Sequence, residues 1–227
     1  MISHQHKCIF IHIPKCAGTS IKYFLFPDEE IHWFNPNYDV IHGFCTKQKI
    51  FMQHATSKQL LEMGLVTQEQ WNSYYKFAFV RNPWDRAVSD YFWLMNDQKI
   101  QDSFANYLNK TGKFTKVLND IGTKNYRGEH LTPQSDFFSE EGVNKIDFVG
   151  RFENFSDDIQ KVLKALDIHH SFDLHINKSD KKVHYSKYYS NELRDKVAST
   201  YQKDIEQFNY TFEDQRTLID RLKFKFK

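Results

Sequence analysis

Short apolar stretches, each followed by a polar loop and then by a helix-like pattern, dominate the 227-residue chain. They span residues 8–13, 77–80 and 145–152. Stretches of this length are typical of strands that are buried on both faces of a parallel sheet. Repeated strand–helix units predict an α/β fold with a central, mainly parallel sheet flanked by helices. At this length we expect a single domain over residues 1–227.

Helical periodicity and capping residues divide the rest of the chain. We expect Ser57 to cap one helix and Ser156 to cap another, whose apolar face covers residues 159–166. Ser190 is expected to open a long helix that continues to residue 208. The lysine-rich end, residues 223–227, is expected to fray.

The composition is ordinary for a globular protein, with 40% hydrophobic and 26% charged residues. The 31 Lys and Arg residues nearly balance the 29 Asp and Glu residues, which gives a net charge of +2. Dedicated nucleic-acid binders usually carry a strong basic excess, so we expect no nucleic-acid partner and only a local anion site. No apolar run approaches the ~18 residues of a membrane span, so we expect no transmembrane segment.

The three cysteines, Cys8, Cys16 and Cys45, are odd in number and widely spaced. They predict neither a disulfide framework nor a CxxC zinc site. We therefore expect a reducing compartment and a cytoplasmic protein. The 11 histidines form no zinc-like set with cysteines or acids, so no metal site is expected.

The loop after the first apolar stretch has the composition of an anion-binding cradle. A strand, a tight loop and a helix start follow one another, and the N–H groups and dipole of a helix start attract anions. Lys15 adds a positive charge, and Gly18 lets the backbone approach a ligand closely. The residues expected to contact the anion are Lys15, Cys16, Ala17, Gly18, Thr19 and Ser20. The alternative interpretation is a plain strand-to-helix turn with a solvated lysine.

This loop differs from that of proteins that bind nucleoside triphosphates. Their motif, G-x-x-x-x-G-K-[ST], places the lysine directly before the hydroxyl residue. Here Lys15 comes first, and Gly18 is the only glycine of the loop. The loop is therefore not a standard nucleotide-triphosphate loop.

A second strand–loop–helix unit follows at residues 77–92. Arg81 comes directly after the apolar stretch, and ligands of open α/β sheets bind outside the carboxyl ends of strands. Ser89 lies eight residues after Arg81, about two turns into the helix that follows. The alternative for Arg81 is a simple ion pair with Asp85.

Five motifs, in this order, resemble those of the carbohydrate sulfotransferases that use 3′-phosphoadenosine 5′-phosphosulfate (PAPS), the Sulfotransfer_2-like group. They are Pro14-Lys15-x-x-Gly18-Thr19-Ser20, Phe79-Val80-Arg81-Asn82-Pro83 with Ser89, His130-x-x-Pro133-Gln134, residues 147–153 and Asn177-Lys178-Ser179. The resemblance covers nearly the whole chain. It implies a P-loop-kinase-like sulfotransferase fold.

The resemblance also implies the chemistry: transfer of a sulfuryl group from PAPS to an acceptor hydroxyl, with a carbohydrate as the expected acceptor. The product of the donor is 3′,5′-ADP (PAP). Lys15 and its loop would hold the 5′-phosphosulfate, and Lys15 would neutralise the charge on the leaving oxygen. Arg81 and Ser89 would hold the 3′-phosphate. Arg151 is a candidate for contact with the base or the 3′ end of the nucleotide, and Lys178 and Ser179 are further candidates for contacts with the nucleotide. The scheme requires no metal.

An acceptor hydroxyl needs a base to take its proton. His54 follows a short apolar piece and lies, in sequence, between the two expected anion cradles. Its place resembles that of the catalytic histidine of carbohydrate members, and histidine titrates near neutral pH. His42 is the alternative base, and the alternative for either residue is a hydrogen-bonded structural histidine.

Two features depart from the family pattern, and two other functions stay open. Cys16 stands where family loops often carry threonine, which removes a hydroxyl and puts a thiol beside the anion. The sequence shows no counterpart of the Golgi anchor of animal members, so we expect either a soluble cytoplasmic form or a piece of a longer protein. A nucleotide or sugar kinase on a related scaffold would need a lysine before the loop hydroxyl and an acid for magnesium. A non-catalytic module that binds PAP or a glycan would have the same anion cradles but would transfer no sulfuryl group.

Overall fold

The computed structural model of the protein describes residues 1–27, 32–138, 146–172 and 183–222. The chain forms two compact units, each built from segments that are distant in sequence. Unit 1 comprises residues 1–80, 122–124 and 136–178, and unit 2 comprises residues 81–121, 125–135 and 179–227. Each unit buries aromatic side chains of its own, such as Phe77 in unit 1 and Tyr107 in unit 2.

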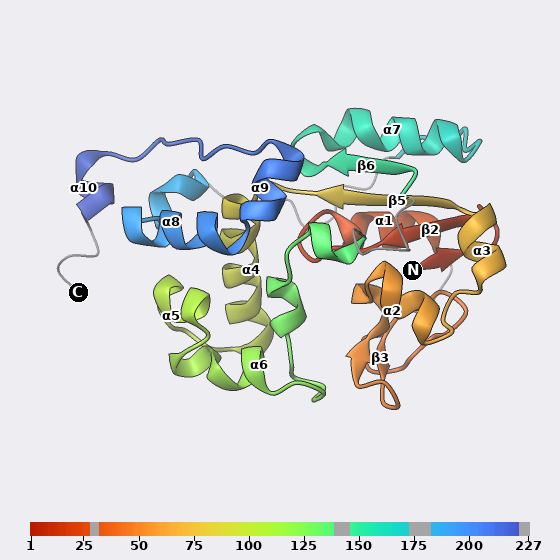
Figure 1. Ribbon diagram of the computed structural model, residues 1–227, viewed down its shortest axis with the longest axis horizontal. Coiled ribbons are helices and arrows are strands. Elements are labelled where there is room, and N and C mark those ends of the chain that lie inside the picture. The colour runs from red at the N-terminus through yellow and green to blue at the C-terminus, as the bar shows by residue number, and fades with distance from the viewer. Residues whose placement is uncertain (28–31, 139–145, 173–182, 223–227) are drawn as a thin grey trace. The chain divides into compact units, whose positions relative to one another are not determined.

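A four-stranded sheet forms the centre of unit 1 (Figure 1). Its order is β1 (Ile2–Ser3), β2 (Cys8–Ile11), β5 (Tyr75–Val80) and β6 (Phe148–Arg151). β2, β5 and β6 run parallel to one another, and β1 pairs antiparallel with β2. The expected mixed α/β architecture with a mostly parallel sheet is therefore confirmed.

β2 and β6 are shorter than the stretches that predict them, whereas β5 begins two residues before its predicted stretch. All four residues of β2 are buried, as a continuous apolar run predicts. β2 ends at Ile11 because the N–H of Ile13 donates back to the Ile11 carbonyl at 3.2 Å. Before β6, the carboxylate of Asp147 accepts the Lys76 N–H at 2.7 Å and pairs with its ammonium at 2.9 Å. The N–H of Asp147 also donates to the Lys76 carbonyl at 2.8 Å, so backbone and side-chain contacts together join the chains at that end of the sheet.

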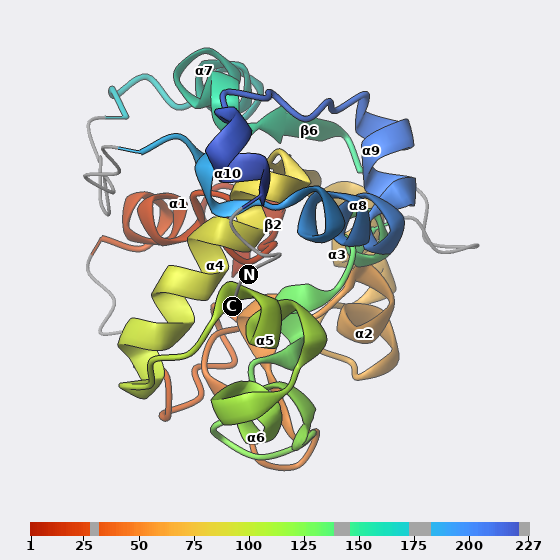
Figure 2. The same cartoon turned by 90° about the vertical axis from the view of Figure 1, so that its left-hand side faces the viewer.

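Helices α1 (Gly18–Leu25) and α7 (Phe155–Ala165) lie on the same side of this sheet (Figure 2). Phe24 of α1 and Phe155 of α7 both contact Phe172, with ring centroids 4.7 and 5.3 Å apart. Aromatic pairs at these distances add to the free energy gained by burial. This cluster therefore joins the two helices over the strands.

The chain between α1 and β5 forms small elements that lead to His54. The hairpin strands β3 (Phe44–Cys45) and β4 (Ile50–Phe51) pair antiparallel. The 3₁₀ turn η1 (Met52–His54) follows β4 directly, and α3 (Gln68–Ser73) precedes β5. The position of His54 is therefore fixed by the hairpin before it.

The helix α2 (Ser57–Glu62) is capped by Thr56 and not, as expected, by Ser57. Oγ1 of Thr56 accepts the N–H of Gln59 at 3.2 Å, and the Gln59 side chain accepts the N–H of Thr56 at 2.9 Å. This reciprocal pair is a capping box. The hydroxyl of Ser57 instead donates to the carbonyl of Phe137 at 2.9 Å.

Two other predictions about where helices begin and end are wrong. Ser156 lies inside α7, whose N-cap is Asn154. The long helix expected from Ser190 to residue 208 is divided at Tyr201, where φ is −114° and ψ is 29°. Apolar residues keep their helical spacing across this break, so the sequence pattern does not reveal it.

Unit 2 is built around α4 (Pro83–Gln98). The side chain of its N-cap, Asn82, accepts the N–H of Trp84 at 3.1 Å. Pro83 occupies the first helical position, where an N–H would have no acceptor within the helix, so the missing N–H of proline costs no hydrogen bond. Further helices are α5 (Phe104–Asn109), α6 (Thr115–Asn119), α8 (Asn191–Thr200), α9 (Gln202–Phe208) and α10 (Leu218–Leu222), with 3₁₀ turns at Gly112–Phe114, Gly128–Leu131 and Tyr185–Tyr188.

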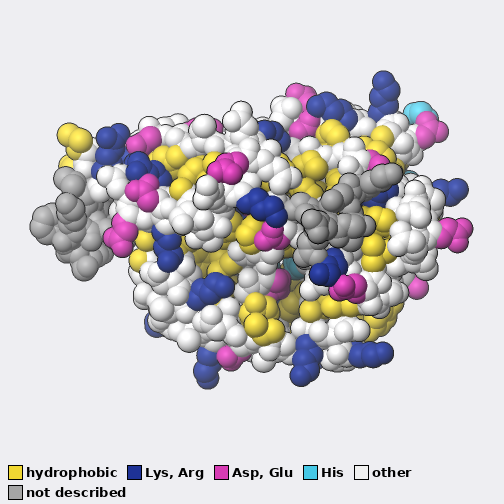
Figure 3. Space-filling view, in the orientation of Figure 1, with side chains coloured by type: hydrophobic (Ala, Val, Ile, Leu, Met, Phe, Trp, Pro, Cys, Tyr) yellow, Lys and Arg dark blue, Asp and Glu magenta, His cyan; other side chains and the backbone are white. Residues whose placement is uncertain are grey.

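Positive and negative side chains are interspersed over the face shown in Figure 3, and no large area of one sign appears on it. This distribution agrees with the net charge of +2. Among the residues that the structure describes, no helix is both long enough and apolar enough to span a bilayer.

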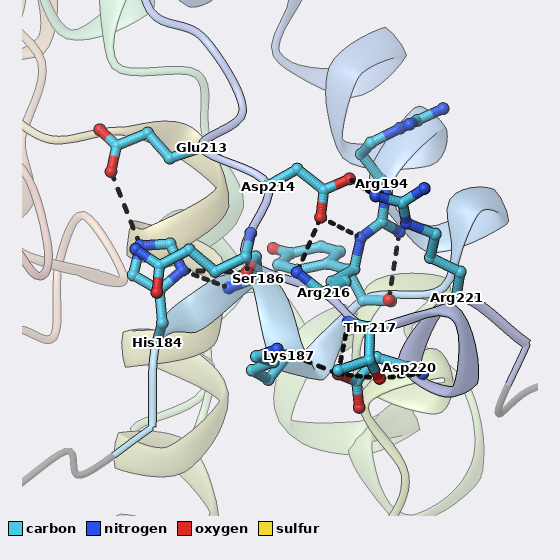
Figure 4. A network of polar contacts seen from close by, with 12 residues as sticks. His184, Ser186, Lys187, Arg194, Glu213, Asp214, Arg216, Thr217, Asp220 and Arg221 are labelled. Carbon is cyan, nitrogen blue, oxygen red and sulfur yellow. Dashed lines mark hydrogen bonds and ion pairs between the residues drawn. The ribbon is translucent and has the colours of Figure 1, made fainter.

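A network of polar contacts ties the C-terminal segment of unit 2 to the turn Tyr185–Tyr188 (Figure 4). Arg216 donates through Nε and Nη2 to the two carboxylate oxygens of Asp214, at 2.8 and 2.9 Å. These hydrogen bonds hold the pKa of Asp214 well below its usual range. Lys187 of the turn pairs with Asp220 at 3.2 Å. Side-chain contacts therefore fix this segment more than regular structure does.

Candidate active site

The backbone of the loop after β2 has a shape that suits an anion. Lys15 and Ala17 have φ angles of 69° and 66°, in the left-handed region that residues with a side chain rarely adopt. Left-handed residues in a loop can turn neighbouring N–H groups toward a common point, and such nests bind anions. Two strained residues on either side of Cys16 therefore support a binding function for this loop.

The start of α1 adds helical N–H donors. Ala17 is the N-cap, and its carbonyl accepts the N–H of Ser20 at 3.1 Å. Across the described part of the chain, the N–H groups of Gly18 and Thr19 have no protein acceptor. First-turn N–H groups find no acceptor inside their own helix. These two donors, with the half-buried Lys15, are therefore placed to bind an anion.

Gly18 is required for close packing. A Cβ at this position would collide with the imidazole ring of His12. The His12 ring also stacks on Phe10, with ring centroids 5.4 Å apart. His12 is thus a site residue that the sequence analysis missed. Its signal was a histidine at the end of a buried strand, two residues before Pro14.

The side chains of the loop differ in their access to a ligand. Cys16 is only 1% exposed, and its Sγ lies 3.6 Å from the carbonyl oxygen of Pro14. Ser20 is also buried, whereas Thr19 is half-buried. Cys16 can therefore offer a ligand its backbone, and Thr19 has the more accessible of the two hydroxyl groups.

His54 lies in unit 1, against the end of β2, and is held in one tautomer. It ends the turn η1 and is 6% exposed. Its Nδ1 lies 3.0 Å from the backbone carbonyl oxygen of His12. A carbonyl only accepts hydrogen bonds, so Nδ1 carries the hydrogen and the neutral ring has its lone pair on Nε2. Nε2 is therefore the nitrogen that can accept a proton.

The end of β2 supports both the anion-binding loop and His54. The imidazole rings of His12 and His54 have centroids 4.6 Å apart. Lys15 follows His12 by three positions, and three residues span at most about 11 Å. The candidate base and the candidate anion-binding lysine thus lie within reach of one small substrate.

His42, the alternative base, has a different environment. It is 2% exposed. Burial, and to a smaller extent the positive charge of Lys22, lowers the pKa of His42 to about 3. A ring with so low a pKa is a weak proton acceptor at neutral pH. The geometry and the pKa therefore favour His54 over His42.

In unit 2, Arg81 comes directly after β5 in the chain. Its Nε and Nη2 donate to Oδ2 of Asp85 at 2.8 and 2.6 Å, so the ion pair with Asp85 is present. Asp85 belongs to the first turn of α4, where the helix dipole stabilises a negative charge. Ser89 lies one turn further along α4 and is half-buried. Arg81 is therefore held at the start of the helix that carries Ser89.

A buried glutamine fixes the backbone of Arg81. Oε1 of Gln134 accepts the N–H of Arg81, and its Nε2 donates to the Arg81 carbonyl, both at 2.8 Å. Asp204 accepts the N–H groups of Gln134 and Ser135 at 2.7 and 2.8 Å. All three of these supporting residues are 0% exposed. Gln134 and Asp204 are thus positioning residues for Arg81, a role that the sequence analysis did not assign.

His130, of the same motif as Gln134, has a structural environment. Its Nδ1 lies 2.6 Å from Oδ1 of Asp90, whose Oδ2 accepts the hydroxyl of Tyr107 at 2.8 Å. Trp93 stacks on the His130 ring, with ring centroids 4.7 Å apart. The motif therefore contributes packing and positioning inside unit 2.

Of the other three candidates, one ends β6 in register with Val80 of β5, and two fall outside the described residues. Arg151 ends β6 with an exposed side chain, and its N–H donates to Asp158 at 2.8 Å. Lys178 and Ser179 fall outside the described residues. Where the structure does describe the chain, no group of three or more His, Cys, Asp or Glu side chains could hold a metal ion.

Comparison with known proteins identifies the class. The Sulfotransfer_2 model, described as a sulfotransferase family, matches residues 1–211. The chain therefore belongs to this sulfotransferase family. It is also similar to a protein of Archaeoglobus fulgidus described as an uncharacterized protein, with 26% identity over 113 residues, which cover 49% of this chain and 83% of that protein. No solved structure matches the chain.

Proposed function

We propose that the protein is a PAPS-dependent O-sulfotransferase whose acceptor is a carbohydrate hydroxyl. One observation carries the proposal: the end of β2 supports both the loop with Lys15 and a His54 ring whose lone pair is on Nε2. An anion cradle close to a base is what sulfuryl transfer to a hydroxyl requires. The succession of β2, cradle and α1 also supports a P-loop-kinase-like sulfotransferase fold.

In the proposed reaction, the acceptor oxygen attacks the sulfur atom of PAPS in line with the bridging oxygen. A new oxygen–sulfur bond forms, the bond from sulfur to the bridging oxygen breaks, and the acceptor proton passes to Nε2 of His54. Lys15 and the N–H groups of Gly18 and Thr19 would stabilise the negative charge left on PAP. His54 then releases its proton to solvent.

The 3′-phosphate of the donor would bind to Arg81 and Ser89. A guanidinium presents its N–H donors in a planar fork that matches the geometry of a phosphate. Ser89 would add a hydroxyl from the next turn of α4. Arg151, Lys178 and Ser179 remain further candidates for contacts with the nucleotide.

Nucleotide binding tests this assignment. The protein should bind 3′,5′-ADP more tightly than 5′-AMP, because only the first carries the 3′-phosphate. Arg81→Ala should reduce this preference about 30-fold, which corresponds to ~2 kcal/mol for a charge-assisted contact. Isothermal titration calorimetry with both nucleotides measures the ratio. Equal affinities in the wild-type protein would contradict the proposed 3′-phosphate site.

A matched control uses another arginine of unit 2. Arg194 pairs with its neighbour Asp195 at 2.6 Å, much as Arg81 pairs with Asp85. Arg194→Ala should leave the ratio of the two affinities unchanged. A similar loss in both variants would mean that the ratio responds to charge in general.

The alternative functions differ in the group donor that they use and in whether they require a metal ion. Radiolabelled PAPS is offered with a panel of sugars, with and without EDTA. Transfer of label that survives EDTA supports the sulfotransferase. Magnesium-dependent phosphate transfer from ATP would support the kinase instead. Binding of PAPS without transfer to any acceptor would support a non-catalytic module.

Gln134→Met should lower both stability and nucleotide discrimination. Methionine has a similar volume but leaves the buried N–H and carbonyl of Arg81 without these partners, which costs on the order of 1–3 kcal/mol of unfolding free energy. Because the backbone of Arg81 would then be less fixed, the preference for 3′,5′-ADP over 5′-AMP should fall as well. Urea denaturation and calorimetry measure the two effects.

Gln53 offers a matched control in unit 1. It is 1% exposed, and its Oε1 accepts the N–H of Gly43 at 2.9 Å. Gln53→Met should therefore cost stability without changing the nucleotide ratio. If Gln134→Met also leaves the ratio unchanged, Gln134 stabilises the fold but does not position Arg81 for a ligand.

We also propose a reducing, cytoplasmic location. Cys8, Cys16 and Cys45 are all buried and form no disulfide. Proteins of oxidising compartments more often use their cysteines in disulfides. Fractionation of cells that express the tagged protein would test this location.

A further inference from the structure

Helix α10 turns a polar side toward the rest of unit 2 and apolar side chains toward solvent. Asp220 is 7% exposed; its Oδ2 accepts the N–H and the hydroxyl of Thr217, both at 2.9 Å, and pairs with Lys187 at 3.2 Å (Figure 4). Leu218 and Ile219 are 75% and 72% exposed. A surface helix usually has the opposite arrangement, with its apolar residues facing the core. Polar contacts therefore hold α10 in place while two adjacent apolar side chains stay in water.

The orientation of α10 is fixed by a second set of ion pairs. Arg221 pairs with Asp214 at 3.3 Å, and Asp214 also accepts two hydrogen bonds from Arg216, which is 6% exposed. Rotating the helix to bury its apolar side would break these contacts and expose the buried Asp220. Hydrophobic side chains accordingly lie at the surface over α10 in Figure 3. The exposure of this apolar side is thus built into the fold of unit 2.

The sequence that continues from α10 is both basic and apolar. Residues 221–227 read Arg-Leu-Lys-Phe-Lys-Phe-Lys, with four basic residues, two phenylalanines and no acid. The whole chain has 31 Lys and Arg against 29 Asp and Glu, so acidic residues outnumber basic ones outside this segment. Positive charge and apolar side chains therefore occur together in residues 218–227, and a partner has to match both.

We propose that α10 and the basic residues that follow it bind the surface of an anionic membrane. Leu218 and Ile219 would enter the boundary between headgroups and acyl chains, and the lysines would meet the phosphate groups of anionic lipids. A second copy of the chain fits less well, because a stable protein interface buries about 1,200–2,000 Å², more than two aliphatic side chains supply. An acidic partner without apolar surface would leave these side chains in water. The inference concerns where the protein works and is independent of the proposed transfer reaction.

Sedimentation of the full chain with lipid vesicles tests this surface. One set of vesicles contains phosphatidylcholine alone, and the other contains equal parts of phosphatidylcholine and phosphatidylserine. The wild-type protein should bind the second set at least about tenfold more tightly than the first, and added salt should weaken this binding because it screens the lysines. Binding to neither set, or equal binding to both, would overturn the proposal.

Two variants remove the apolar and the basic part separately. Leu218→Ser combined with Ile219→Ser should weaken binding to the anionic vesicles about tenfold, since two apolar side chains no longer leave water. Lys223→Gln, Lys225→Gln and Lys227→Gln together should weaken it about 100-fold, at about fivefold for each lysine. Both variants should keep the melting temperature of wild type, which shows that they fold. Wild-type affinity in either variant contradicts the assignment.

Unit 2 also offers matched controls. Ile121 is 80% exposed, so Ile121→Ser removes an accessible aliphatic side chain from another place. Lys110→Gln, Lys113→Gln and Lys116→Gln together remove three exposed positive charges. Both controls should bind the anionic vesicles as wild type does. Losses as large as those of the test variants would mean that binding responds to charge or hydrophobicity in general, and the specific surface would have to be abandoned.

A fluorescent label shows whether α10 enters the lipid. Ile219→Cys introduces an accessible thiol, whereas Cys8, Cys16 and Cys45 are at most 2% exposed, so an environment-sensitive dye reacts at position 219. Its emission should shift to the blue when the anionic vesicles are added. Binding without this shift would mean adsorption by charge alone and would refute the proposal. A dimer that forms without lipid, and that Leu218→Ser with Ile219→Ser abolishes, would refute it in favour of a second copy.

Discussion

His54→Ala should lower sulfuryl transfer by about 10²–10⁴-fold, the range that loss of a general base typically gives. The substitution removes the proton acceptor Nε2 and leaves the loop around Lys15 in place. Affinity for 3′,5′-ADP should therefore match that of wild type. Single-turnover kinetics with labelled PAPS, together with calorimetry, measure the two quantities separately.

Chemical rescue distinguishes a base from a structural histidine. Free imidazole added to His54→Ala can accept the proton and should restore part of the rate, whereas it would not repair a damaged fold. If His42→Gln folds and abolishes transfer while His54→Ala stays active, the base has been assigned to the wrong residue.

The parallel sheet could be predicted because its strands are buried on both faces. All residues of β2 and all but the first of β5 are buried, which leaves near-continuous apolar runs in the sequence. Helix starts were less predictable. Thr56 and Ser57 are adjacent residues with similar capping ability. Thr56 is the N-cap of α2, whereas the hydroxyl of Ser57 donates to the carbonyl of Phe137, which lies 80 positions away in the chain.

Part of the site could likewise be predicted from neighbouring residues in the sequence, whereas the rest depends on residues that are far apart in the chain. The order of residues around Lys15 indicates an anion cradle without any knowledge of the fold. The tautomer of His54 depends on the carbonyl of His12, 42 positions earlier in the chain. The role of Gln134 depends on the backbone of Arg81, 53 positions away. Folding creates contacts at such separations, and no local pattern encodes them.

Lys15→Met should lower turnover by about 10²–10³-fold, as removal of one donor to a developing anion does in other enzymes. Methionine keeps an unbranched side chain and removes the charge. Negative charge on the bridging oxygen is greatest as its bond to sulfur breaks, so the lysine stabilises the transition state more than bound PAPS. Affinity for 3′,5′-ADP should therefore fall less than turnover, and kcat and calorimetry together check this.

Lys7 provides the matched control at the opposite end of β2. It is exposed and has a φ of 46°, so Lys7→Met removes the same charge from another left-handed lysine next to the same strand. This variant should keep wild-type turnover, and Lys15→Arg should retain more activity than Lys15→Met because it keeps the charge. If Lys15→Met weakens 3′,5′-ADP binding as much as it slows turnover, Lys15 anchors the bound nucleotide. The N–H groups of Gly18 and Thr19 would then be the remaining donors to the leaving oxygen.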